Sequence, residues 1–340
     1  MSCSELRKTD GSGSMAPALQ YAPSQAGGDA VISEIKFVTQ GVEQLDRAIR
    51  FYQDAFGFVE HGRMRVAGPA FEAAWRMPAG LTGEAVVLGL PDRRSGLLRL
   101  VQFDRRGERI WGNYERIQDL GHYAVNYRYR DITTGWQRLL AAGATKKSEP
   151  IYWKVNEDIE AWDAQAYDPD GVLLDVFEVR GNLEGTIGWL FTDASEVQSV
   201  AIHVSDDARM QRFLEGLGFR VLFDTTLEGM GHFLGVSEDI RVHNVNFISP
   251  HAPNGRIEFS RYLGTDGKPL TDRAVPPNIG ILAISLETDD LKDTNSLVVA
   301  LGATPIAEPF EAEMPPFGRV LFATFHGPDG EQWEFFQRLD

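Results

Sequence analysis

Two polar residues lie inside apolar, strand-like segments and could bind a metal ion. His122 is the second residue of Gly-His-Tyr-Ala-Val-Asn-Tyr, and Asp175 lies between Leu174 and Val176. A carboxylate without a partner is costly in an apolar strand, so Asp175 is expected to face a cation. Imidazole and carboxylate groups bind divalent transition metals. We therefore predict that both residues are metal ligands, the alternatives being a core histidine and an ion-paired aspartate.

An internal repeat relates the segment around these residues to the end of the chain. Ala-Gly-Ala-Thr at 142–145 recurs as Leu-Gly-Ala-Thr at 301–304, and Asp-Pro-Asp-Gly at 168–171 recurs as Gly-Pro-Asp-Gly at 327–330. The two motifs are 28 residues apart in both copies. A repeat with constant spacing indicates a duplicated structural unit.

The unit that repeats is a β-α-β-β-β module. Alternating apolar residues from Val31 predict a strand, and helical spacing over 45–56 ends at Gly57. Strand-like segments follow at 59–66, 84–89 and 97–103. The order recurs over 196–260, with strands expected near 220–224, 231–235 and 243–248.

These patterns predict an α+β fold of four modules in two pairs, each pair a cupped mixed sheet with helices outside. We expect the first pair to span 31–180 and the second 196–340, with a linker over 181–195. Residues 1–30 have the composition of a tag and flexible leader.

Composition excludes several classes of function. The formal net charge is −16 and the pI is near 4.9, which argues against nucleic-acid or anionic-membrane partners. There is no apolar run long enough to cross a membrane and no apolar core of a signal peptide. A single cysteine, Cys3, excludes intrachain disulfides. We expect a cytoplasmic protein, monomeric or homodimeric, that acts on a small molecule.

The chain resembles the vicinal oxygen chelate superfamily, which includes glyoxalase I, extradiol dioxygenases and bleomycin-resistance proteins. The segments that carry the resemblance are Ala-Ile-Arg-Phe-Tyr-Gln-Asp-Ala-Phe-Gly-Phe at 48–58, Gly-His-Tyr-Ala-Val at 121–125, and Asp-Pro-Asp-Gly followed four residues later by an acid. The resemblance covers nearly all of the chain after residue 30. It implies paired modules that surround one divalent metal.

The resemblance also implies where metal ligands should lie, on the first and last strands of the modules. In the first half these places fall on Glu34, Arg99, His122 and Asp175. We predict Glu34, His122 and Asp175 as ligands of Mn²⁺, Fe²⁺ or Zn²⁺, with positions left open for substrate. In the second half the places fall on Ser199, Ile281 and Glu334, so that half is expected to hold a degenerate site.

Glu34 and Arg99 are also the predicted catalytic residues. Glu34 would transfer a proton, the alternative being a surface or salt-bridge role. Arg99 would bind a carboxylate or phosphate of the substrate; alternatively it would neutralise an acid and make the site metal-free.

Aromatic residues are expected to enclose the substrate. The segment from Tyr152 to Tyr167 is interpreted as a loop that forms either a solvated turn or a lid, with Tyr152, Trp153 and Trp162 against a flat substrate. Trp75 would form the opposite wall.

Three functions follow from these residues. The first is a metal-dependent lyase or isomerase for a small oxygenated metabolite, either aromatic or aliphatic. The second is an Fe²⁺ extradiol-type ring-cleaving dioxygenase. The third is a metal-free protein that binds a small molecule and confers resistance.

Overall fold

The fold is described from a computed structural model of the 340-residue chain. The structure describes residues 30–155, 157–183, 187, 188, 190 and 192–339. The predicted leader lies outside these residues except for Ala30, and so does Cys3.

The four predicted modules are all present. Module one contains β1 (Ile32–Gly41), α1 (Leu45–Phe56), β2 (Val59–Val66), α2 (Pro69–Ala74), β3 (Gly83–Gly89) and β4 (Leu97–Phe103). Module two contains β5 (Gly121–Arg128), α3 (Ile132–Ala141), β6 (Thr145–Lys146), β7 (Ile151–Lys154), β8 (Ile159–Tyr167) and β9 (Leu173–Gly181). Module three contains β10 (Ser199–His203), α4 (Asp207–Gly216), β11 (Arg220–Leu227), α5 (Gly231–Leu234), β12 (Val242–Ile248) and β13 (Arg256–Tyr262). Module four contains β14 (Gly280–Thr288), α6 (Leu291–Ala300), β15 (Thr304–Pro305), β16 (Phe310–Glu313), β17 (Arg319–His326) and β18 (Gln332–Arg338).

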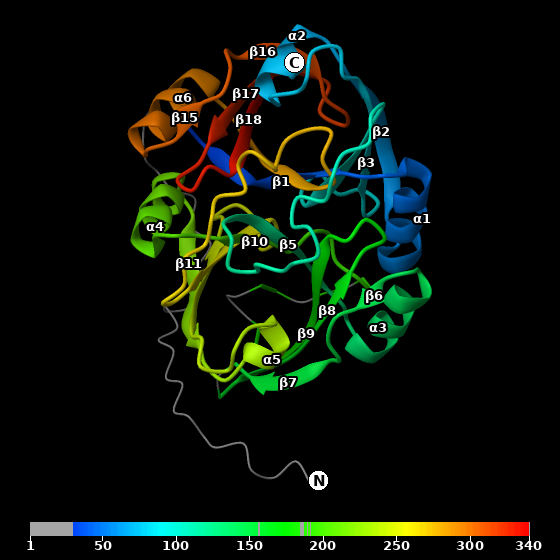
Figure 1. Cartoon of the computed structure of the whole chain (residues 1–340), viewed down its shortest axis with the longest axis vertical. Helices are drawn as coiled ribbons and strands as arrows, with labels where there is room; N and C mark the ends of the chain where they lie inside the picture. Colours follow the sequence, from blue (N-terminus) through cyan, green and yellow to red (C-terminus); the bar gives the residue numbers. More distant parts are fainter. Residues whose placement is uncertain (1–29, 156, 184–186, 189, 191, 340) are drawn as a thin grey trace.

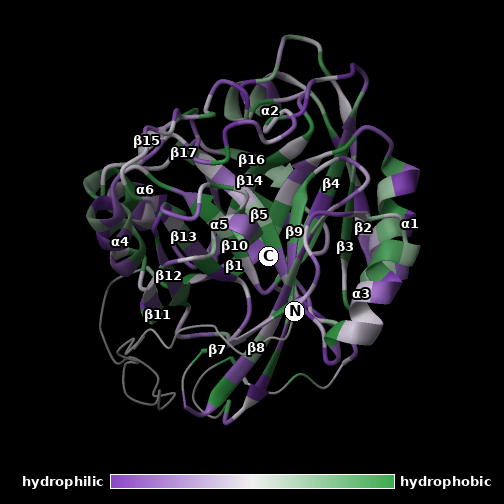
Figure 2. Cartoon of the chain, turned by 60° about the horizontal axis from the view of Figure 1, so that its bottom comes forward, coloured by the Kyte–Doolittle hydropathy of each residue, from purple (hydrophilic) through white to green (hydrophobic). Residues whose placement is uncertain are grey.

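The main helix of each module follows from local sequence. In α3, α4 and α6 an aspartate at the N-cap, Asp131, Asp206 or Asp290, accepts a hydrogen bond from the backbone N–H three residues later. Helix α1 has no such cap, and it ends at Gly57, whose φ of 74° suits glycine. Figure 2 shows both hydrophobic and hydrophilic residues along α1, as expected for a helix that packs one face on a sheet.

The sheets combine the modules in a different way from the prediction. The first sheet has the order β15-β17-β18-β14-β1-β4-β3-β2, and the second has β11-β12-β13-β10-β5-β9-β8-β6. Module one therefore pairs with module four, and module two with module three. Figure 1 shows the first sheet in the upper half of the molecule and the second in the lower half. The prediction that modules one and two share a sheet, as do three and four, is wrong.

Two long connections explain this pairing. One follows β4 over residues 104–120 and the other follows β13 over 263–279, and each passes from one sheet to the other. They hydrogen-bond to each other, with the Ile110 amide 2.9 Å from the Ile279 carbonyl and the Leu270 amide 3.0 Å from the Leu120 carbonyl. The predicted linker over 181–195 instead connects β9 to β10 within the second sheet.

Two local predictions are also wrong. Residues 231–234 form helix α5 rather than a strand. The expected loop over 152–167 contains strands β7 and β8, which pair antiparallel. Both changes matter because these segments border the cavity described below.

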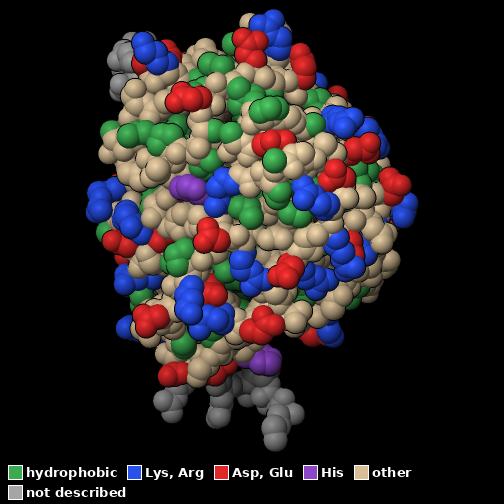
Figure 3. All heavy atoms as spheres, turned by 45° about the horizontal axis from the view of Figure 1, so that its top comes forward, with side chains coloured by type: hydrophobic (Ala, Val, Ile, Leu, Met, Phe, Trp, Pro, Cys, Tyr) green, Lys and Arg blue, Asp and Glu red, His purple; other side chains and the backbone are tan. Residues whose placement is uncertain are grey.

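Charged side chains of both signs lie on the surface. On the face shown in Figure 3, acidic and basic side chains are interspersed. Among the described residues, no helix is long and apolar enough to cross a membrane.

Candidate functional site

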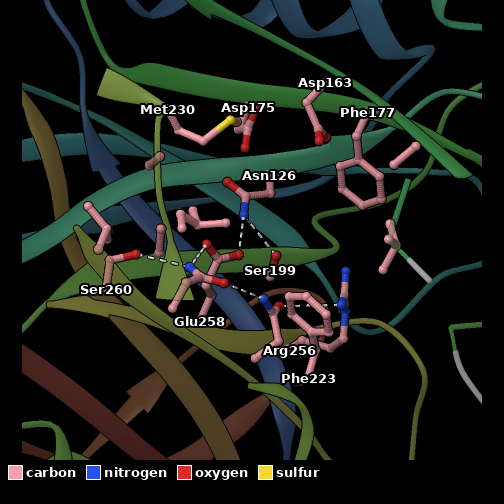
Figure 4. Close-up of a pocket in the computed structure, with 18 of the residues that line it drawn as sticks. Asn126, Asp163, Asp175, Phe177, Ser199, Phe223, Met230, Arg256, Glu258 and Ser260 are labelled. Atoms are coloured by element: carbon pink, nitrogen blue, oxygen red, sulfur yellow. Dashed lines mark hydrogen bonds between the residues drawn. The ribbon is translucent and has the colours of Figure 1, made fainter. Parts of the chain in front are cut away.

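A cavity of about 220 Å³ lies on the second sheet. Four adjacent strands, β9, β5, β10 and β13, contribute Asp175, Asn126, Ser199 and Glu258 to its floor (Figure 4). Asn126 pairs with Asp175 on one side and with Ser199 on the other, and Glu258 pairs with Ala201 two residues along β10. Alternate residues of a strand face the same side, so these residues line one surface. We call this cavity the second cup.

The amides of the floor orient one carboxylate and leave other oxygens unpaired. Asn126 Nδ2 donates to Ser199 Oγ at 3.0 Å and to Glu258 Oε2 at 3.1 Å, and Asn244 Nδ2 donates to Glu258 Oε1 at 2.7 Å. The Oδ1 atoms of Asn126 and Asp175 are buried without a hydrogen-bond partner. Buried acceptors without donors are costly. The floor therefore favours a cation or a ligand that donates hydrogen bonds.

A third carboxylate, Asp163 on β8, lines the same cavity. Burial is the main cause that raises the pKa of Asp163 to about 7, and the charge of Glu258 raises it further. The indole Nε1 of Trp153 donates a hydrogen bond to Asp163 and opposes this shift. In the absence of a cation, Asp163 gains or loses a proton near neutral pH.

The other two acids also retain protons more readily than usual. Burial raises the pKa of Asp175 well above its ordinary range, and the charges of Asp163 and Glu258 add to the shift, whereas Lys147 opposes it. Burial likewise raises the pKa of Glu258, against the hydrogen bond from Asn244. The three acids thus repel one another when all are ionised.

Basic side chains neutralise the cluster only in part. Arg256 is the one Lys or Arg among the described residues that line the cavity. Its Nη1 lies 3.4 Å from Asn246 Oδ1, and its Nε has no partner. Lys147 is not among the lining residues, and its Nζ donates to Gln165 Oε1 and, at 2.7 Å, to the Phe233 carbonyl.

The corresponding region of the first sheet is filled by buried side chains. Arg99 Nη2 donates to Glu334, and Arg99 Nε donates to Thr39 Oγ1 at 3.0 Å. Both charged side chains are fully buried. The guanidinium carbon of Arg99 lies 5.2 Å from the ring centre of Phe37 and 5.1 Å from that of Trp75. We call this packed region the first cup.

The two cups contain matching positions. The repeat relates Asp175 to Glu334, since each lies four residues after the last glycine of the repeated motif. Arg99 and Glu258 lie on the last strands of modules one and three and pair with the parallel first strands β1 and β10. The first cup therefore has an Arg–Glu ion pair where the second cup has two acids, Glu258 and Asp175.

The predicted set of three metal ligands is not assembled. Glu34 forms an ion pair with Lys36 at 2.6 Å and does not line the second cup. His122 Nε2 lies 2.9 Å from the carbonyl oxygen of Gln332 in module four, and burial lowers the His122 pKa to about 4. A register shift in the pairing of β5 with β10 separates the His122 pair from the Ala124 pair. Only Asp175 of the three faces the cavity. The prediction of a Glu34–His122–Asp175 site is wrong.

No alternative cluster of the usual ligand types replaces it. Among the described residues, no group of three or more His, Cys, Asp and Glu side chains is arranged to hold a metal ion. A metal in the second cup would therefore require an amide oxygen in addition to carboxylates.

The other predicted site residues are divided between the two cups and the surface. Arg99 and Trp75 are buried in the first cup and cannot reach a ligand in the second. Trp153 lines the second cup. Tyr152 is 53% exposed and its ring centre lies 5.1 Å from that of Trp162, which also packs against Arg180. In the β7–β8 pair, alternation directs Trp153 inward and Tyr152 outward.

Sequence reasoning missed Asn126, Asp163 and Glu258. A signal for Glu258 was available, because polar and apolar residues alternate through Arg-Ile-Glu-Phe-Ser at 256–260. His203 also lines the cavity. Its ring stacks on Tyr123 at 3.8 Å between ring centres, and burial lowers its pKa to about 3.

Comparisons with known proteins confirm the resemblance inferred from sequence. Residues 34–176 match the sequence model of the Glyoxalase/Bleomycin resistance protein/Dioxygenase superfamily. No curated protein sequence matches the chain.

Similar solved structures extend the likeness to the whole fold. Glyoxalase I from Zea mays is 17% identical, with a TM-score of 0.57 over 90% of this chain and 92% of that one. A Bacillus subtilis protein described as a dioxygenase candidate is 13% identical, with a TM-score of 0.55 over 91% of this chain and 86% of that one. At these identities the likeness concerns the fold alone. Residues 34–176 thus carry the sequence features of the glyoxalase and dioxygenase superfamily, within a four-module fold shared with these structures.

Proposed function

We propose that the chain is a metal-dependent enzyme of the vicinal oxygen chelate type whose active site is the second cup. The observation that carries the proposal is the pair of acids at Asp175 and Glu258. At the matching positions of the first cup, Glu334 is neutralised by Arg99. The second cup has no arginine at the position of Arg99, so a bound cation would supply the missing positive charge.

The donor set fits a hard cation. Asp175 and Asn126 each have an unpaired Oδ1, and Glu258 is held beside them by the amide of Asn126. Carboxylate and amide oxygens suit Mg²⁺, Mn²⁺ or a similar ion. These three residues would hold the metal, which when bound supplies a Lewis acid that polarises a substrate oxygen.

The chain's own residues would orient the substrate and move a proton. Asp163 lines the same cavity, and the Trp153 indole fixes its carboxylate. We assign proton transfer to Asp163, in place of the predicted Glu34, because the Asp163 carboxylate lines the cavity that holds the proposed metal ligands, whereas Glu34 does not. Proton transfer beside a polarised oxygen supports lyase or isomerase chemistry.

A ring-cleaving dioxygenase has less support. Non-haem Fe²⁺ oxygenases use two histidines and one carboxylate. Of the described residues that line the second cup, only His203 is a histidine, and it is enclosed by Tyr123, Trp111 and Tyr262.

Elemental analysis of the tag-free protein tests the proposal. We expect about one divalent metal per chain in wild type and loss of that metal in Asp175→Asn and Glu258→Gln. Glu34→Gln is the matched control, because Glu34 is an acid of the rejected ligand set and should not affect metal content.

Two outcomes would contradict the proposal. One is a wild-type protein that stays metal-free after anaerobic loading with Mn²⁺, Fe²⁺ and Zn²⁺, which would favour the metal-free binding protein. The other is metal content that depends on Glu34 and not on Glu258. The cytoplasmic location and the monomeric or homodimeric state stay predictions.

A further inference from the structure

The walls of the second cup differ in chemistry from its floor. One wall comes from module two and includes Trp153, Ala161 and Phe177. The opposite wall comes from module three and includes Phe223 and Phe233. Figure 4 shows Phe177 on the side of Asp163 and Phe223 on the side of Arg256. All the charged side chains that line the cavity, as far as the structure describes it, belong to the floor or to β8, so the upper space is enclosed by apolar groups.

The apolar walls set a condition on the ligand. Phe177, Phe223 and Trp153 are only half-buried in the ligand-free protein, so part of each ring is available to a bound molecule. Covering such surface with an apolar body is favourable. Placing an anionic group there is costly, because Asp163, Asp175 and Glu258 repel it and Arg256 is the one Lys or Arg among the described lining residues.

The volume limits the size of that body. An engineered apolar cavity of about 150 Å³ binds benzene. The second cup has about 220 Å³. It therefore has room for one substituted ring or two fused rings, while a long chain or a peptide conjugate would extend outside.

We propose that the second cup binds an uncharged compound of one or two fused rings, with its hydroxyl or carbonyl oxygens toward Asp175 and its ring body between Phe177 and Phe223. The orientation of the oxygens rests on the proposed function. The presence of a ring rests on the wall residues alone. A hydroxyl group can donate to the unpaired oxygens of Asn126 and Asp175.

Two probes with the same ring system test the proposal. 1-Naphthol is uncharged and carries one hydroxyl, whereas 1-naphthalenesulfonate carries a fixed negative charge. We would measure binding of each by calorimetry, once with the protein as purified and once with EDTA present. We expect 1-naphthol to bind and the sulfonate to bind at least about tenfold more weakly in both conditions.

A matched pair of variants on β8 locates the binding. Ala161 faces the cavity and is 3% exposed, so Ala161→Phe should fill the cup and abolish 1-naphthol binding. Glu160 is exposed on the other side of the same strand, and Glu160→Phe should bind as wild type does. Should Ala161→Phe fail to fold, Leu227→Trp at the opposite wall replaces it.

Each contrary result overturns a stated part of the inference. Equal binding of the two probes would overturn the preference for uncharged compounds. Binding of 1-naphthol that survives the cavity-filling variant would place the ring elsewhere. Absence of 1-naphthol binding to wild type would overturn the proposal that the cup binds a ring. None of these results changes the metal content, so failure of this inference is distinguishable from failure of the proposed function.

Discussion

The two cups are built from the same modules, yet one is a packed core and the other a cavity. In the first cup Glu334 is bound by Arg99, whereas in the second Asp175 faces Glu258. The acid of the first cup thus has its own counter-charge, whereas Arg256 neutralises the acids of the second cup only in part. At matching positions of the repeated fold, Arg99 thus completes a buried ion pair, whereas Glu258 adds a second acid.

Side-chain volume follows the same division. Phe37 of the first cup pairs with β14 and packs against Phe317 and Phe336, with ring centres 5.3 Å and 5.8 Å away. The matching position on β10 is Ser199, followed by Ala201, which pair with β5. Small residues on the floor leave space that large rings fill in the first cup. Charge and volume therefore differ together.

The largest expected effect is the loss of the buried cation in the first cup. Arg99→Met should lower the free energy of unfolding by about 3–5 kcal/mol, because Glu334 is left buried without a counter-charge. The double variant Arg99→Met/Glu334→Leu should recover most of that loss. Urea denaturation measures both, with Arg63→Met at an exposed ion pair as a control expected to cost no more than about 1 kcal/mol. A cost for Arg99→Met as small as that of the control would refute the structural role of the pair.

An intermediate effect is expected in the pH dependence of the unfolding free energy, measured on the metal-free protein. The native pKa of Asp163 is raised to about 7 from 3.8, so the native state holds a proton that the unfolded state releases. This contribution to stability is present below pH 3.8 and is lost as the pH rises to about 7. Between pH 3.8 and about 7, the unfolding free energy of Asp163→Asn should therefore decline less steeply than that of wild type.

Denaturation at several pH values, with EDTA present, checks this expectation. Glu258, Asp175 and Trp153 interact with Asp163, and they remain unchanged in the variant. Identical profiles for the variant and wild type would show that Asp163 does not retain its proton. Added Mn²⁺ should reduce the decline in wild type if the acids bind it.

The smallest expected effect separates two neighbouring aromatic residues. Trp153→Phe removes the hydrogen bond to Asp163 and should cost about 1–2 kcal/mol of unfolding free energy. Tyr152→Ala, on the exposed side of the same strand, should change it by no more than about 0.5 kcal/mol. Thermal or urea denaturation measures the loss of unfolding free energy in both variants. A larger loss in Tyr152→Ala than in Trp153→Phe would contradict the inward position of Trp153.

The sequence was sufficient for the modules but not for their pairing. Periodicity predicted α1 and most strands, and the repeated glycine motifs predicted four units. The same repeat is compatible with either pairing of the modules, because all four have the same plan. The pairing depends on contacts of β1 with β14 and of β5 with β10, which are far apart in the chain.

The sequence predicted only the site residue that can be recognised from its own strand. Asp175 was found because a carboxylate in an apolar strand is unusual. His122 was misplaced because a register shift beside it cannot be read from alternation alone. Glu258 was missed because its importance appears only when module three is placed beside module two.

The most direct test of the comparison is to give the second cup the cation of the first. We would titrate Mn²⁺ into wild type and Glu258→Arg by calorimetry, and measure the unfolding of both proteins. We expect about one Mn²⁺ site per chain in wild type and none in Glu258→Arg, which should remain folded because the arginine can pair with Asp175. Equal Mn²⁺ binding in the two proteins, or none in wild type, would contradict this expectation.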